Sequence, residues 1–150
     1  KRKGMKLLSV KTKNEKETML VGEKFASVIN KGDIILLSGD LGAGKTHFVK
    51  GFAVGMGCKS MVTSPTFTIL NVYEGGKMPI YHFDMYRLSS KEEAEELGFE
   101  EYFDHNLLDG VCLVEWPEQV SGLLNGEHYN VTIKKGDGEN EREIIVEKKK

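Results

Sequence analysis

The sequence has no long hydrophobic run and little net charge. Its longest purely aliphatic run, Ile34–Leu37, has four residues, whereas a membrane-spanning helix needs about 20. Lysine and arginine number 21 against 23 acids, a net charge of −2. This balance excludes a protein that coats nucleic acid or a membrane surface with uniform positive charge. The basic start is followed only by Leu7 and Leu8 before polar residues return, so we expect no signal peptide.

Cysteine is also scarce. Cys58 and Cys112 are far apart, neither belongs to a Cys-x-x-Cys pair, and the four histidines are scattered, so zinc-finger spacing is absent. Cys112 lies in the apolar run Val111–Val114, which predicts a buried, inert thiol. Such cysteine usage is typical of a reduced, cytoplasmic protein.

The length and composition fit a single folded domain. The chain has 150 residues, of which 39% are hydrophobic and 29% charged, enough for a packed core with a polar exterior. We expect one domain over residues 1–150, with flexible ends at 1–5 and 147–150. Residues 1–16 are strongly basic and residues 84–104 strongly acidic. Each segment is either a solvated surface or a docking patch for a charged partner.

Hydrophobic periodicity predicts an α/β sheet with added antiparallel pieces. Asn14 and Ser90 are expected to cap helices, and Gly32, Gly57 and Gly98 to end them. The predicted helices cover residues 14–30, 45–56 and 90–97, and the predicted strands cover 6–10, 33–38, 67–74, 79–84, 111–115, 128–135 and 142–148.

The most informative segment is Gly39–Thr46, which reads Gly-Asp-Leu-Gly-Ala-Gly-Lys-Thr. It matches the phosphate-binding pattern G-x-x-x-x-G-K-[ST], between a predicted buried strand and a predicted helix as the motif requires. Glycines let successive backbone N–H groups turn toward phosphate oxygens, and the helix N-terminus adds partial positive charge. Lys45 neutralises the β- and γ-phosphates and the Thr46 hydroxyl binds Mg²⁺. The sequence therefore predicts a P-loop NTPase-like three-layer fold with a central, mostly parallel sheet.

A P-loop protein also needs an acid on a neighbouring strand to hold the metal or to activate water. Asp84 and Glu115 each end an apolar run. The carboxyl ends of parallel strands border the ligand crevice of an open α/β sheet. We therefore expect both carboxylates to face the phosphates, and which of them positions the attacking water stays open.

A second motif has a simpler explanation. Asn30–Asp33 has the letters of the guanine-reading N-K-x-D signature, but it follows a predicted helix and precedes the strand that leads into the P-loop. Its side chains should lie at the opposite end of that strand from the nucleotide. The sequence contains no D-x-x-G switch motif. A helix-ending role explains these residues better than a GTPase does.

Four segments together resemble the TsaE (YjeE) family. The resemblance covers roughly residues 15–135, and the order and spacing of the segments match, which makes the combination specific although no segment is specific alone. The segments are Gly39–Thr46, Ser64–Thr68, Tyr81–Leu88 and Leu113–Pro117, which include the S-P-T-F loop, the H-F-D-x-Y-R-L run and the E-W-P strand end.

This resemblance implies a small bacterial ATPase that uses ATP and Mg²⁺. The family is needed for the threonylcarbamoyl modification of the adenosine next to the anticodon of tRNA. Its members work with the TsaB–TsaD pair, in which TsaD transfers the threonylcarbamoyl group, and their ATPase depends on that complex. We therefore expect protein partners, an indirect link to tRNA, no membrane partner and a cytoplasmic location. Oligomeric state and direct tRNA contact stay open.

The resemblance also assigns roles residue by residue. The phosphate loop corresponds to Gly39, Gly42, Ala43, Gly44, Lys45 and Thr46. Thr46 and Glu115 match the Mg²⁺ ligands, Thr66 matches an element that senses the γ-phosphate, and Asp84 matches a second acid near the metal. Trp116 is expected to stack beside the site, and Glu15 is a weaker match to a nucleotide contact. His47 stands where a second hydroxyl residue is expected, which puts the α-phosphate contacts in doubt.

The preferred mechanism is an ATP-driven switch. ATP binds across the P-loop, Asp84 orients water or bridges to the metal, and Thr66 and Arg87 respond to the γ-phosphate. One alternative is a small-molecule kinase, although no acceptor-binding lid is evident after the P-loop. Another is a binding module whose docking depends on ATP occupancy alone, with hydrolysis incidental.

Overall fold

Seven strands and three α-helices make up the part of the chain that the structure describes. The computed structural model describes residues 4–40, 44–59, 69–86, 88, 90–104, 106–119, 122, 124 and 126–149. The strands are β1 (Gly4–Thr12), β2 (Ile34–Ser38), β3 (Leu70–Tyr73), β4 (Ile80–Asp84), β5 (Val111–Glu115), β6 (His128–Lys135) and β7 (Arg142–Lys149). The helices are α1 (Glu15–Ala26), α2 (Lys45–Met56) and α3 (Lys91–Glu96), with two 3₁₀ turns, η1 (Phe99–Phe103) and η2 (Pro117–Gln119).

All seven strands form one sheet with the order β1-β7-β6-β2-β5-β4-β3. The four central strands, β6, β2, β5 and β4, run parallel to one another. β3 is added antiparallel at one edge, and the antiparallel pair β7 and β1 extends the other. The predicted α/β fold, with a parallel centre and antiparallel additions, is confirmed.

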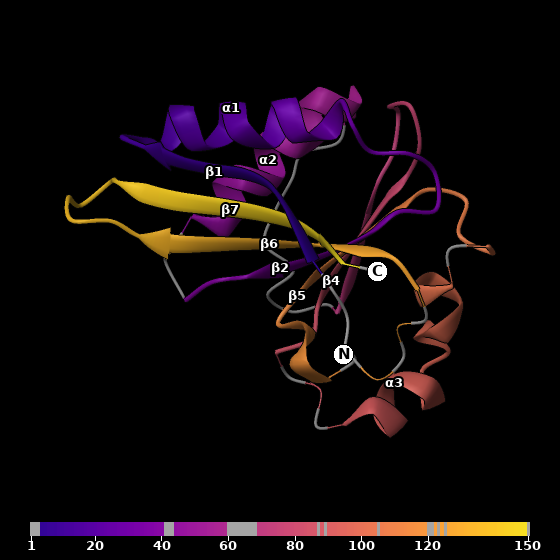
Figure 1. Ribbon diagram of the computed structural model, residues 1–150. Helices are drawn as coiled ribbons and strands as arrows, with labels where there is room; N and C mark the ends of the chain where they lie inside the picture. Colours follow the sequence, from indigo (N-terminus) through magenta and orange to yellow (C-terminus); the bar gives the residue numbers. More distant parts are fainter. Residues whose placement is uncertain are drawn as a thin grey trace.

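Successive side chains along a central strand point to opposite faces of the sheet, and they belong to two separate hydrophobic clusters, one on each face. Ile35 and Leu37 belong to the cluster that α1 and α2 cover, and Ile34 and Leu36 belong to the one that α3 and η1 cover. Figure 1 shows α1 and α2 on one side of the sheet and α3 on the other. The layers are therefore helix, sheet, helix.

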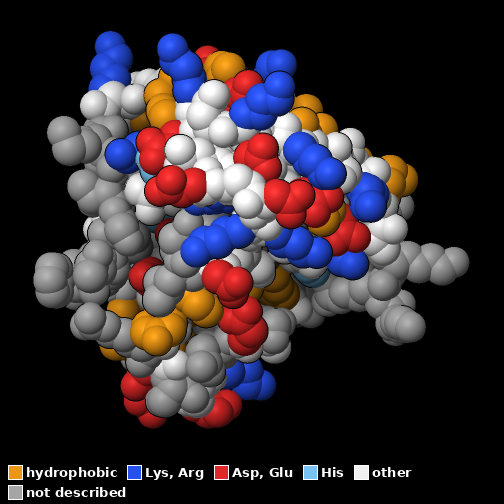
Figure 2. Space-filling view, turned by 90° about the vertical axis from the view of Figure 1, so that its left-hand side faces the viewer, with side chains coloured by type: hydrophobic (Ala, Val, Ile, Leu, Met, Phe, Trp, Pro, Cys, Tyr) orange, Lys and Arg blue, Asp and Glu red, His pale blue; other side chains and the backbone are white. Residues whose placement is uncertain are grey.

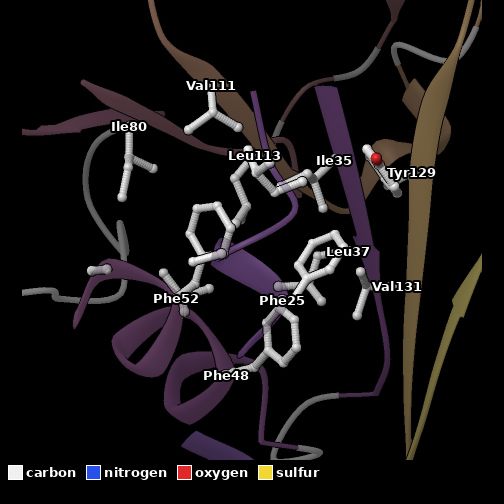
Figure 3. Close-up of a cluster of buried hydrophobic side chains, with 14 of the residues drawn as sticks. Phe25, Ile35, Leu37, Phe48, Phe52, Ile80, Val111, Leu113, Tyr129 and Val131 are labelled. Carbon is white, nitrogen blue, oxygen red and sulfur yellow. The ribbon is translucent and has the colours of Figure 1, made fainter. Parts of the chain in front are cut away.

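Aromatic side chains carry the contact between the helices and the sheet. Phe25 of α1 packs against Phe48 and Phe52 of α2, with ring centroids 6.1 and 6.0 Å apart. It also meets the ring of Tyr129 of β6 edge-on at 5.3 Å. Figure 3 shows these rings turned toward the aliphatic side chains of the sheet. Phe48 and Phe52 are fully buried, so this cluster fixes α2, and with it the N-cap residue Gly44, against the sheet.

Local capping signals set the helix ends. Asn14 accepts a hydrogen bond from Glu17 N–H at the start of α1, and Ser90 accepts one from Glu93 N–H at the start of α3, as predicted. α2 has its predicted bounds and ends at Gly57, whose φ is 80°. α1 ends at Ala26 rather than near residue 30. After Ala26 the backbone hydrogen bonds join residues three apart, as in a 3₁₀ helix. The first of them runs from Ser27 N–H to Lys24 O.

The first and last strands pair with each other near the two ends of the described chain. Gly4 and Met5 pair with Lys149 and Lys148 in the β1–β7 ladder, and Glu147 also lies within β7. Residues 4–5 and 147–149, which were expected to belong to flexible ends, thus lie within paired strands. Backbone hydrogen bonds to β1 and β6 hold the end of β7, although its sequence is mostly charged.

Two other expectations concern burial and the membrane. Cys112 is completely buried in β5, as predicted, and burial raises the pKa of its thiol. Cys58 is partly buried and is likewise a free thiol, with its pKa raised by burial. Among the described residues, no helix is both long and apolar enough to cross a bilayer.

α1 and α2 approach each other closely at glycine positions. A Cβ atom added to Gly51 would lie 1.8 Å from Met19 O, and one added to Gly22 would lie 2.2 Å from Phe48 O. Both contacts are to backbone atoms, so neither can be relieved by a side-chain rotation. The glycines therefore set the distance between the two helices.

We expect Gly51→Ala to lower the free energy of unfolding by about 1–3 kcal/mol, the usual cost of overpacking, despite the better helix propensity of alanine. Thermal unfolding followed by circular dichroism measures the change. The matched control is Val54→Ala on the exposed side of α2, which should stay within roughly 0.5 kcal/mol of the parent. Equal stability of the Gly51→Ala variant and the parent would contradict the close approach.

Candidate functional site

A pocket of about 260 Å³ lies at the carboxyl end of the parallel strands, beside the N-terminus of α2. It lies where open α/β sheets bind their ligands. Figure 2 shows this end of the molecule, where Lys and Arg side chains lie between groups of Asp and Glu. Three regions form its lining: the start of α1, the start of α2 with the ends of β4 and β5, and the β6–β7 turn with the start of β7. The lining residues are Glu15, Thr18, Gly44, Lys45, Thr46, His47, Asp84, Glu115, Trp116, Asn140 and Arg142.

The N-terminus of α2 opens into this pocket without a side-chain cap. Its N-cap is Gly44, whose φ of 100° lies in the left-handed region that favours glycine. A Cβ at Gly44 would find ordinary space, 3.5 Å from Arg142 Nε, so conformation rather than crowding requires the glycine. The first backbone N–H groups of a helix have no partner within it. They and the positive end of the helix dipole form a ready site for an anion.

Lys45 is a buried cation beside these amides. Its side chain is only 7% exposed, and Nζ has no hydrogen-bond partner among the described residues. Nζ lies 3.9 Å from Glu115 Oε1 and 4.1 Å from the centroid of the Trp116 ring. A buried ammonium without hydrogen bonds is costly, and a ligand with acceptor oxygens would satisfy it.

The two predicted acids lie side by side. Asp84 ends β4 and Glu115 ends β5, and the two residues are direct partners in the parallel ladder. Glu115 is also paired with Leu37, one residue before the end of β2. Glu115 is buried, whereas Asp84 is partly exposed and accepts a hydrogen bond from Tyr86 N–H. Both residues line the pocket together with Gly44 and Lys45, and that their carboxylates face phosphates stays a prediction.

Glu15 and His47 also line the pocket. Glu15 starts α1 and His47 lies in the first turn of α2, and their side chains approach to 3.3 Å. Both positions were expected near the nucleotide. The residue that departs from the family pattern, His47, thus faces a carboxylate of the neighbouring helix.

Trp116 directly follows β5, lines the pocket and has an unusual backbone conformation. Its φ is 56°, a left-handed conformation that costs a non-glycine residue roughly 1–2 kcal/mol. The ring lies over Lys45 Nζ, and its centroid is 4.9 Å from that of Tyr86. Strained backbone of this kind persists where the surroundings impose it, often at functional sites.

The remaining predicted residues lie elsewhere or outside the described part of the chain. Gly39 follows β2 and is not among the described residues that line the pocket. Gly42, Ala43 and Thr66, together with Arg87 and the Ser64–Thr68 loop, lie outside the described residues.

Four residues at or behind the pocket were not predicted. Thr18 lies one turn after Glu15 in α1, Asn140 comes from the β6–β7 turn, and Arg142 begins β7. That turn reaches the pocket because β6 runs parallel to β2 as its neighbour, so both strands end at the same edge. His82 was noted only as part of the H-F-D-x-Y-R-L run, yet its Nε2 lies 2.5 Å from Glu115 Oε2.

The donor set fits a polyphosphate and a hard divalent cation. The uncapped amides of α2 and the buried Lys45 ammonium suit phosphate oxygens. The Thr46 hydroxyl and the Glu115 carboxylate are hard oxygen ligands of the kind that Mg²⁺ takes. Among the described residues there is no group of three His, Cys, Asp or Glu side chains placed to hold a metal ion. Mg²⁺ in nucleotide sites usually takes one or two protein carboxylates and completes its coordination with phosphates and water.

Comparisons with known proteins agree with one another. A family model described as "Threonylcarbamoyl adenosine biosynthesis protein TsaE" matches residues 12–144. The chain is 46% identical over 140 residues to the "tRNA threonylcarbamoyladenosine biosynthesis protein TsaE" of Bacillus subtilis (strain 168), covering 93% of this chain and 85% of that protein. It is 43% identical over 125 residues to the protein of the same name from Rickettsia prowazekii (strain Madrid E), covering 81% and 82%. A crystal structure of Bacillus subtilis YdiB matches with a TM-score of 0.75 at 37% identity, covering 98% of this chain and 86% of that one.

Proposed function

This chain belongs to the TsaE family, whose role lies in tRNA threonylcarbamoyladenosine biosynthesis, and on that premise we propose that it is an ATPase. In this proposal it binds ATP with Mg²⁺, hydrolyses it, and supports the TsaB–TsaD complex in modifying the adenosine next to the tRNA anticodon. The observation that carries the proposal is Lys45, a buried ammonium with no hydrogen-bond acceptor among the described residues, beside the N-terminus of α2, which has no side-chain cap.

The phosphates are proposed to lie against the amides of the turn that ends at Gly44, with Lys45 on the β- and γ-phosphates. The same turn contains Gly39, Gly42 and Ala43, whose amides are expected to take part. Thr46 and Glu115 are the proposed Mg²⁺ ligands, and when bound Mg²⁺ neutralises charge on the phosphate oxygens. Trp116 forms the wall beside Lys45.

For hydrolysis, a water molecule attacks the γ-phosphorus, the bond to the β-phosphate oxygen breaks, and ADP, phosphate and a proton are released. Asp84 is proposed to accept a hydrogen bond from this water, since its carboxylate lines the pocket next to Glu115. Thr66 is proposed to respond to the γ-phosphate. Glu15 and His47 are proposed to contact the rest of the nucleotide.

As the resemblance to the TsaE family implies, we propose that TsaB–TsaD completes the site. Electrophilic groups that partners add to other NTPases raise turnover about 10³- to 10⁵-fold. We therefore expect slow ATP hydrolysis by the isolated protein and at least a tenfold increase with purified TsaB–TsaD. An ADP-release assay with and without the two partners measures this, and omitting Mg²⁺ is the control. Equal turnover in both cases would contradict the proposed partner dependence.

A further inference from the structure

A buried chain of hydrogen bonds runs from β3 through β4 to the acid at the end of β5. The Tyr73 hydroxyl lies 2.8 Å from His82 Nδ1, and His82 Nε2 lies 2.5 Å from Glu115 Oε2. The three residues are 3%, 1% and 6% exposed. The proposed function uses Glu115 alone and leaves Tyr73 and His82 without a role.

Strand pairing places these side chains together. His82 is opposite Leu113 in the parallel β4–β5 ladder, and Tyr73 is opposite Ile80 in the antiparallel β3–β4 hairpin. Because side chains alternate along a strand, His82 shares a face with Ile80, and Glu115 shares a face with Leu113. Ile80 and Leu113 both belong to the apolar cluster under α2. A polar chain in such surroundings is tolerated only when its hydrogen bonds are made.

Donor and acceptor rules determine which group donates in each of these two hydrogen bonds. An ionised carboxylate only accepts hydrogen bonds, so the Nε2–H of His82 donates to Glu115. In a neutral ring the other nitrogen, Nδ1, is then an acceptor, and the Tyr73 hydroxyl donates to it. The tautomer of His82 and the orientation of its ring are therefore both fixed by its neighbours.

We propose that His82 and Tyr73 are positioning residues for Glu115. By holding Oε2, His82 leaves Oε1 as the oxygen that Glu115 presents to the pocket, where Lys45 Nζ lies 3.9 Å away. Tyr73 in turn holds the ring of His82. The consequence for Mg²⁺ rests on the proposed function, in which Glu115 is a ligand. Outer residues that orient metal ligands typically contribute 10- to 100-fold in metal affinity.

The test compares His82→Leu, which removes the donor, with His82→Gln, whose amide nitrogen can still donate to Glu115, and with Tyr73→Phe, which removes only the hydroxyl. The control is Tyr81→Phe on the same strand, whose hydroxyl donates instead to Asp109 at 2.6 Å. Calorimetry measures the affinity for ATP with Mg²⁺ and with EDTA, and the ratio of the two is the Mg²⁺ enhancement.

We expect His82→Leu to lower the Mg²⁺ enhancement by about tenfold while the affinity in EDTA stays unchanged. His82→Gln should restore most of it, Tyr73→Phe should lower it in the same direction by a smaller factor, and Tyr81→Phe should leave it unchanged. A general structural defect would weaken binding in EDTA as well. If His82→Leu does not fold, Tyr73→Phe still tests the proposal.

A second measurement needs no nucleotide. ¹⁵N NMR of the histidine rings should show His82 protonated at Nε2, and a proton on Nδ1 alone would overturn the assigned direction. If the parent protein shows a Mg²⁺ enhancement and both His82→Leu and Tyr73→Phe keep it, the positioning role is wrong. If the parent itself binds ATP no better with Mg²⁺, the proposed function fails and the Mg²⁺ part of this inference fails with it.

Discussion

Replacing Lys45 with alanine is expected to weaken ATP binding by roughly 10- to 100-fold. A hydrogen bond that involves a charged group contributes about 1.5–3 kcal/mol, and each 1.4 kcal/mol is tenfold in affinity. The expected loss is at the upper end of this range because the ammonium is buried and has no acceptor among the described residues. Isothermal titration calorimetry of ATP with Mg²⁺ measures it.

The matched control for this variant is Lys50→Ala. Lys50 lies on the same helix and carries the same charge, but it is exposed, so its removal should change affinity by less than about twofold at physiological salt, where surface charges are screened. Unchanged ATP affinity in the Lys45→Ala protein would refute the role given to this lysine.

Glu115→Gln is expected to lower ATP hydrolysis by about 10²- to 10³-fold, the size typical of losing one group that stabilises transition-state charge. The amide keeps the size of the side chain and removes its charge, so ATP should still bind in EDTA while the Mg²⁺ enhancement is lost. The ADP-release assay in the presence of TsaB–TsaD measures hydrolysis, and Glu100→Gln, an exposed acid in η1, is the control.

The same variant distinguishes two hypotheses for the function, an ATP-driven switch and a binding module that depends on ATP occupancy alone. If Glu115→Gln traps ATP and still supports tRNA modification with TsaB–TsaD, occupancy rather than turnover is what the partners need. Loss of modification together with retained binding supports the ATP-driven switch. Normal hydrolysis by this variant would contradict the role of Glu115.

The centre of the site could be predicted because its signals are local. Gly44 and Lys45 belong to one short motif, and α2 begins and ends at the predicted residues because a glycine lies at each end. Asp84 and Glu115 were found because each follows a short apolar run. Two parallel strands of equal length then bring those ends into register.

The rest of the site depends on pairing between distant segments. Asn140 and Arg142 reach the pocket because β6 lies next to β2, and no local pattern specifies this strand order. The contact of His82 with Glu115 joins residues 33 positions apart. The positive φ of Trp116 also had no sequence signal, since it arises where the chain leaves β5 under the constraint of its neighbours.

The central claim is that the turn ending at Gly44, with the acid at the end of β5, binds the triphosphate of ATP. Amide NMR of the ¹⁵N-labelled protein during titration with ATP and Mg²⁺ tests this most directly. Trp116 is the single tryptophan of the sequence, so its indole signal needs no further assignment. We predict saturable shifts at the Gly44, Lys45 and Thr46 amides and at the Trp116 indole. Shifts confined to other parts of the protein at saturating ATP, or none at all, would contradict the account.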